Sequence, residues 1–88
     1  MDVFSVKPKN QPTVVRKKLG KEQAHGKYTA LHNLIEIDER LKGRKEMTIY
    51  IHEYFHKLFP DMEEEEVILK SEYLTDFMWA HNFRKVDL

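Results

Sequence analysis

The sequence predicts a small α+β domain, in which a β-hairpin or a three-stranded antiparallel sheet packs on an antiparallel helical hairpin. Three observations predict this fold. Alternating apolar and polar residues favour strands in the first half of the chain, whereas helical periodicity dominates the second half. A proline, Pro60, divides the helical half into two segments. The 88 residues, 41% of them hydrophobic, suffice for one small core.

The chain is expected to divide into a short arm and one domain. Residues 1–13 contain two prolines and two lysines among polar residues, so we expect a flexible basic N-terminal arm there. Residues 14–88 would form the single domain. The chain has no cysteine, and disulfides and cysteine-based zinc sites are therefore excluded.

Two runs in the first half are candidates for strands. A short β-rich run covers residues 13–16 and is followed by a polar segment with two glycines, which suits turns. The stronger candidate covers residues 27–38, where the apolar residues of one face recur with a period of two (Leu31, Ile35 and Ile37). Together the two runs predict a hairpin or a small antiparallel sheet.

The first helix is predicted over residues 44–59. One apolar stripe recurs at spacings of four, four and three residues (Met47, Ile51, Phe55 and Leu58), and a neighbouring stripe contains both histidines of the segment (Ile49, His52, His56 and Phe59). The histidines are therefore expected at the border of the buried face. Pro60 ends the helix.

The second helix is predicted to begin after Asp61, which resembles an N-cap with Glu64 completing a capping box, and to run to about Asn82. Its apolar side carries six residues (Val67, Ile68, Leu74, Phe77, Met78 and Trp79). Because only a few residues join the helices, we expect them to pack side by side in opposite directions.

The chemistry of the chain is concentrated in residues 52–56, His52-Glu53-Tyr54-Phe55-His56, which have the form H-E-x-x-H. Residues four apart on a helix share a face, so the two histidines can direct their imidazoles at one metal ion. Glu53 projects beside them and can serve as a general base. This arrangement is typical of zinc peptidases, and the reaction attached to it is peptide hydrolysis.

A hydrolytic zinc ion needs a third protein ligand. Glu64 is the best candidate, because it lies on the side of the second helix that carries Val67 and Ser71 and is expected to face the histidines. Glu72 is the next candidate, one turn deeper. Three other acidic residues are turned away from the site or lie too far along the helix (Glu65, Glu66 and Asp76). Any one of the glutamates at residues 63–66 also has a simpler explanation, which is compensation of the helix dipole.

The remaining histidines and the tyrosines near the motif are weaker candidates for a role at the metal site. His32 could sit over the metal as a polarising or metal-ligating group, although a surface position on the strand is the simpler interpretation. His25 is expected in a turn, and His81 at the C-terminal end of the second helix, where it suits the dipole. Tyr50 and Tyr54 could donate to an oxyanion, but packing is the simpler explanation for each of them.

Charge and hydrophobicity limit the classes of partner. The chain has 15 basic and 15 acidic residues, and this balance disfavours nucleic acid, although the first 27 residues are basic. No apolar run is long enough for a membrane span or resembles a signal peptide, so we expect a cytoplasmic protein without a membrane partner.

Beyond H-E-x-x-H, residues 28–86 resemble small phage and prophage proteins of the minimal zincin type, whose wider relatives are the SprT-like and ImmA/IrrE-like metallopeptidases. The resemblance is carried by residues 35–43, 48–53, 56–60, 64–67 and 77–79. It implies a small sheet on the motif helix, a zinc ion held by His52, His56 and a third residue, Glu53 as the base, and, for a phage protein, the cytoplasm of the host. The SprT pattern would supply a third histidine, which is missing between His56 and His81, so a glutamate as in gluzincins fits better.

Two functions follow from the sequence. The first is a zinc-dependent metallopeptidase that binds a peptide or protein substrate by adding it as an extra strand along residues 31–37. Since so small a chain offers only an open groove, a partner protein, a second copy or the basic arm would help to select the substrate. The alternative is a non-catalytic interaction or structural protein of the phage type, in which the metal is absent or only structural.

Overall fold

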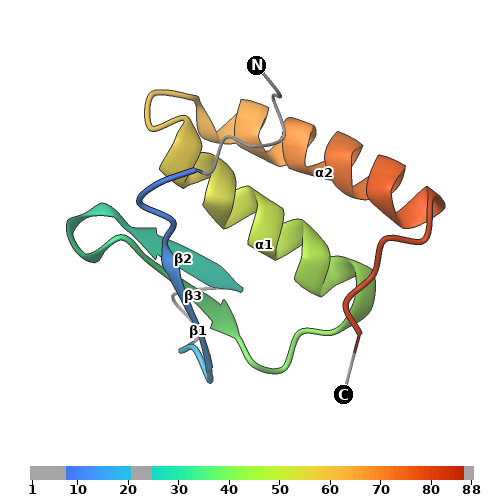
Figure 1. Ribbon diagram of the computed structural model, residues 1–88, viewed down its shortest axis with the longest axis horizontal. Helices are drawn as coiled ribbons and strands as arrows, with labels where there is room; N and C mark the ends of the chain where they lie inside the picture. Colours follow the sequence, from blue (N-terminus) through green and yellow to red (C-terminus); the bar gives the residue numbers. More distant parts are fainter. Residues whose placement is uncertain (1–7, 21–24, 87–88) are drawn as a thin grey trace.

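Three short strands precede two helices along the chain. The computed structural model describes residues 8–20 and 25–86, and all structural statements concern these residues. The elements are, in order, β1 (Thr13–Lys17), β2 (Gly26–Thr29), the 3-10 turn η3 (Ala30–His32), β3 (Leu34–Asp38), α1 (Gly43–Leu58) and α2 (Glu64–Ala80). Figure 1 shows α1 between the sheet and α2, so this helix forms the middle layer. The predicted α+β class is confirmed.

The sheet is mixed rather than antiparallel. The strand order is β1-β3-β2, so β3 is central; it pairs antiparallel with β2 and parallel with β1. The predicted antiparallel sheet is therefore wrong for β1, and the hairpin lies within the second predicted run instead. A parallel pair needs a connection of about a dozen residues or more, and β2 with η3 lies in that connection.

The single strand predicted over residues 27–38 is interrupted. Residues 30–32 form η3, and Asn33 follows in the left-handed region with φ of 46°. Asparagine tolerates this conformation better than branched residues do. The interruption places Leu31 on the surface with 86% of its area exposed, whereas Ile35 and Ile37 are buried. The period of two predicted the core residues of β3 correctly and failed at the turn.

Asn33 also holds the segment that leads into β1. Its side-chain amide donates to the backbone oxygens of Asn10 and Gln11, at 2.9 and 3.3 Å, and its backbone oxygen accepts from Thr13. Most of the arm predicted over residues 1–13 lies outside the described residues, namely residues 1–7. Residues 21–24, in the polar turn segment, and residues 87–88, at the end of the predicted domain, also lie outside them.

The core is small and lies between β3 and the two helices. Its fully buried apolar side chains are Ile35, Ile37 and Val67. On α2 the buried positions next to Val67 are hydroxyl residues, Ser71 and Thr75, and each donates to the backbone oxygen four residues earlier, at 2.6 and 2.7 Å. These bonds satisfy the hydroxyls inside the helix, so neither of them carries an unpaired polar group into the core.

Both helices run close to their predicted limits. In α1 the predicted stripe is only partly buried, since Leu58 is exposed. The first turn of α2 differs from the prediction: Glu63 is the N-cap, without a side-chain hydrogen bond, so Asp61 does not form the capping box. The apolar side predicted for α2 is correct at Val67 but wrong at three positions, which are exposed (Ile68, Leu74 and Phe77). The two helices pack as an antiparallel hairpin (Figure 1).

Candidate metal centre

His52 and His56 lie one turn apart on the same face of α1. Their Nε2 atoms are 3.2 Å apart, and their ring centroids 4.8 Å apart with the rings nearly perpendicular. Both side chains are half-buried, because the face that carries them borders the sheet. The helical spacing of four therefore directs two nitrogen atoms at one point.

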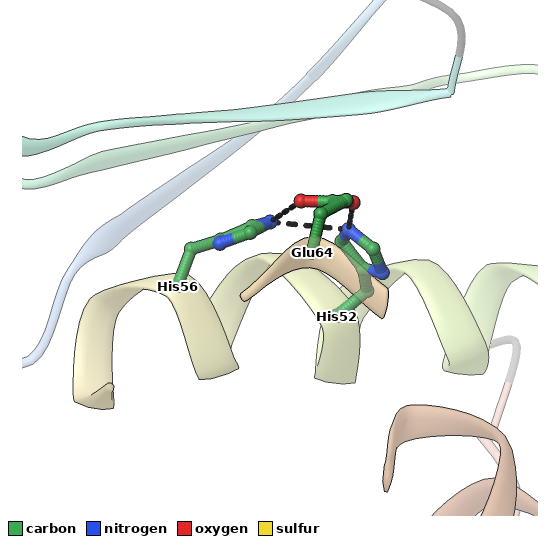
Figure 2. Close-up of side chains that lie close together, drawn as sticks. All are labelled: His52, His56 and Glu64. Carbon is green, nitrogen blue, oxygen red and sulfur yellow. Dashed lines mark hydrogen bonds and ion pairs between the residues drawn. The ribbon is translucent and has the colours of Figure 1, made fainter. Parts of the chain in front are cut away.

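Glu64, the first residue of α2, completes a group of three. Its Oε1 lies 2.8 Å from Nε2 of His52, and its Oε2 lies 2.9 Å from Nε2 of His56. Figure 2 shows its carboxylate beside both imidazoles, on the side of α1 that faces the sheet. The short connection after Leu58 returns the chain so that the start of α2 is level with the motif. Within the described residues, these are the side chains that could together hold a metal ion.

The donor set fits zinc. Two imidazole nitrogens and one carboxylate are ligands that Zn²⁺ uses at about 2.0–2.2 Å, and a tetrahedral centre then separates its ligands by about 3.3 Å. The 3.2 Å between the histidine nitrogens matches this separation. The carboxylate would have to retreat by about half an ångström, and Glu64 has room to do so because its side chain is 58% exposed. A tetrahedral ion on these three ligands would keep a fourth position for water or substrate.

Glu53 lies in a different environment from Glu64. It is only 7% exposed, and its Oε2 is 4.0 Å from Nε2 of His52. Burial, with the nearby charge of Glu64, raises the pKa of Glu53 to about 7. Burial also lowers the pKa of His52, an effect that the charge of Glu64 opposes. The site therefore places a buried acid beside three side chains that could hold a metal.

A cavity of about 700 Å³ lies over the motif, and β2 forms one wall of it. Gly26 is the closest part of that wall: a Cβ there would stand 2.8 Å from Cγ2 of Ile49 and 3.1 Å from Cγ of Glu53. The absence of a side chain lets α1 approach β2. Sequence reasoning placed Gly26 in a turn and missed this role, although a glycine within a strand can mark a close backbone approach.

The other acidic candidates lie elsewhere. Glu72 is paired with Arg44 at 3.0 Å, and Asp76 contacts the same guanidinium, so the charge of Arg44 accounts for both carboxylates. Glu65 and Glu66 are exposed on α2. Of the glutamates predicted as a possible third ligand, only Glu64 contacts both histidines.

Of the remaining histidines, His25 lies near the motif and the other two lie away from it. His25 lies in a turn, as predicted, and lines the cavity. His32 is exposed in η3, and His81 forms the C-cap of α2 against the ring of Phe77. Tyr54 donates to the side chain of Gln11 at 2.9 Å, which gives it a structural role at the arm.

Neither described helix combines the length and the hydrophobicity that a bilayer crossing requires. Comparison of the chain with protein-family models, with curated proteins and with solved structures finds no match in any of the three.

Proposed function

We propose that the chain is a zinc-dependent metallopeptidase in which His52, His56 and Glu64 hold the metal and Glu53 is the general base. The observation that carries the proposal is the convergence of the three ligand side chains, whose donor atoms lie within 4.8 Å of one another. Its support is geometric: three ligands of the kinds that zinc prefers, one open position, and a carboxylate beside it.

In this proposal a zinc ion supplies Lewis acidity, which polarises the scissile carbonyl and makes water a stronger acid. The protein supplies the proton transfers. Glu53 accepts the proton of the attacking water and later delivers it to the leaving amine. The close approach of Gly26 to the Glu53 side chain would hold the carboxylate beside the cavity.

The substrate is an extended peptide that lies in the cavity beside β2. β3 is paired on both sides and cannot accept a further strand, whereas β1 and β2 lie at the edges of the described sheet, and of these two β2 borders the cavity over the motif. Peptide addition along residues 31–37 is therefore wrong, and we place the peptide along Gly26–Thr29. Backbone hydrogen bonds from this strand would hold the peptide in register with the metal.

The metal is tested by zinc stoichiometry and thermal melting, with and without chelator, for the wild type, His56→Ala and the control His32→Ala. We expect about one zinc per chain and a lower melting temperature with chelator for the wild type and the control, but neither effect for His56→Ala. A wild-type protein that binds no zinc and melts unchanged with chelator would overturn the proposal.

Catalysis is tested on the zinc-loaded protein with a fluorescently labelled unfolded protein as substrate. Glu53→Gln should abolish cleavage while zinc stays bound, and Glu66→Gln, an exposed glutamate on α2, should leave cleavage intact. If zinc binds but Glu53→Gln changes no proteolytic activity, the metal is structural. It would then tie the start of α2 to the end of α1, and the non-catalytic alternative would hold.

A further inference from the structure

A second cavity, of about 800 Å³, lies at the opposite end of α1. Its walls come from β1, the start of α1, the end of α2 and the C-terminal segment 83–85, which Figure 1 shows in red beside the first turns of α1. It shares no lining residue with the cavity over the motif. Glu46, in its wall, precedes His52 by six residues, which is roughly 9 Å along the helix and about 120° around it. The two cavities are therefore separate.

Aromatic side chains form much of the wall. Trp79 comes from the last turn of α2, Tyr50 from α1 and Phe83 from the C-terminal segment. Phe83 is 57% exposed, although a side chain of this size is usually buried when it has no partner. These rings offer flat apolar surfaces to a ligand, and the volume is in the range of small-molecule sites, about 300–1,000 Å³.

The cavity has four cations and one buried carboxylate. The carboxylate is Glu46, and Arg16 pairs with its Oε2 at 2.9 Å. The other terminal nitrogen of Arg16 donates to the backbone oxygens of Glu39 and Leu41, both at 3.0 Å. Arg16 and Glu46 therefore neutralise each other, and Lys85 adds a second, longer contact to the same oxygen at 3.5 Å.

The other two cations of the wall are Lys42 and Arg84. Within the part of the chain that the structure describes, neither Lys42 nor Arg84 lies within ion-pair distance of a carboxylate. Arg84 instead lies over the ring of Trp79, with 4.1 Å between its guanidinium carbon and the ring centroid. The cavity therefore carries a surplus of positive charge beside an aromatic surface.

We propose that this cavity binds a small aromatic anion. The planar body of the ligand would pack against Trp79 and Phe83, and its carboxylate, sulfonate or phosphate would pair with Arg84 and Lys42. A single cavity of this volume beside one charge cluster favours a small molecule over a polymer, which needs a groove that continues along its backbone. The proposal does not depend on a metal at His52 and His56.

The full-length protein is titrated with 1-anilinonaphthalene-8-sulfonate and with its uncharged analogue N-phenyl-1-naphthylamine, while amide and indole NMR shifts are recorded. Trp79 is the only tryptophan, so its indole signal reports directly on the cavity. We expect saturable shifts at Trp79 and in residues 42–50 and 83–85 with the sulfonate, and at least severalfold weaker binding of the uncharged analogue. Added salt should weaken binding of the sulfonate and leave binding of the uncharged analogue unchanged.

Three variants make the test specific. Arg84→Gln should weaken sulfonate binding by about fivefold, the order of one partly exposed ion pair, without weakening binding of the uncharged analogue. Glu46→Gln should strengthen sulfonate binding, because it removes the one anion of the wall. Lys70→Gln is the control, since Lys70 lines a different apolar groove, between Leu58 and Tyr73.

Three results would overturn the proposal. They are an unchanged affinity in Arg84→Gln, shifts confined to the groove at Lys70, and equal binding of the charged and uncharged probes. Shifts at Trp79 with a short single-stranded oligonucleotide, but none with the sulfonate, would assign the cavity to nucleic acid instead and would also overturn it. The variants are first compared with the wild type by melting and by their amide spectra, which confirms that each one folds.

Discussion

At the scale of single residues, the position of a carboxylate decides what it can do. Glu53 is buried and its pKa is raised to about 7, whereas Glu64 reaches the same cavity from the surface of α2. A buried carboxyl next to a second acid is suited to exchange protons near neutral pH, and an exposed one is suited to bind a cation. The two glutamates thus fit different roles in one site.

Replacement of Glu64 by alanine should weaken zinc binding by at least about tenfold to 100-fold, the range seen when even outer-shell partners of a metal are removed. The control is Glu65→Ala, which removes a neighbouring exposed glutamate that does not contact the histidines. Competition with a chromogenic zinc chelator measures both affinities. Equal affinities in the two variants would exclude Glu64 as a ligand.

Asp38 should make stability depend on pH. It is 2% exposed and accepts hydrogen bonds from Arg40, whose side chain contributes most, and these bonds hold the pKa of Asp38 well below its ordinary value. Because the pKa is depressed in the folded state, the stabilisation is complete above the unfolded-state pKa of about 3.9 and is lost as the pH falls below it.

We therefore expect Asp38→Asn to lower the melting temperature most at neutral pH, and the difference from the wild type to shrink below about pH 4. Melting followed by circular dichroism between pH 2 and 7 measures this difference. Asp61→Asn, at an exposed position between the helices, is the control and should track the wild type at every pH. A difference for Asp38→Asn that stays constant over the whole range would contradict the prediction.

At the scale of elements, close packing between β2 and α1 brings Glu53 to the cavity. A methyl group at Gly26 would meet Ile49, Glu53 and the backbone oxygen of Glu36 at 2.8, 3.1 and 3.2 Å. Gly26→Ala should therefore destabilise the fold by about 1–3 kcal/mol, the usual cost of overpacking. Gly20→Ala is the matched control, because a Cβ there meets nothing within 4 Å. Urea unfolding compares the two variants; equal stabilities would show that the contact relaxes freely.

The elements that the sequence predicted well are those with local signals. The extents of the two helices, the stop at Pro60 and the side of α2 that carries Glu64 and Val67 follow from local signals such as spacings of three and four residues. The pairing of β1 with β3 joins residues 21 positions apart, such as Thr13 and Leu34, and no local pattern encodes it. The same holds for Gly26, since its importance depends on a helix that arrives later in the chain.

At the scale of the whole molecule, the fully buried apolar core is small, and a metal that joins α1 to α2 would add substantially to stability. Zinc at 100 times its dissociation constant should stabilise the folded state by about 2.7 kcal/mol. For a domain of this size that is a rise of about 10–20 °C in melting temperature. Calorimetry with increasing zinc checks the dependence, and His52→Ala should show no rise.

The mixed sheet also has a consequence for the order of assembly. The β2–β3 hairpin closes between Thr29 and Leu34, five residues apart, whereas β1 must find β3 across 21 residues. The longer closure costs roughly 1 kcal/mol more in chain entropy, and β1 is exposed along its whole length. We expect β1 to dock last and to open first. In native-state hydrogen exchange, the amides of β1 should therefore exchange before those of α1. The residues of the candidate metal centre should keep their arrangement while β1 detaches from β3 and pairs with it again.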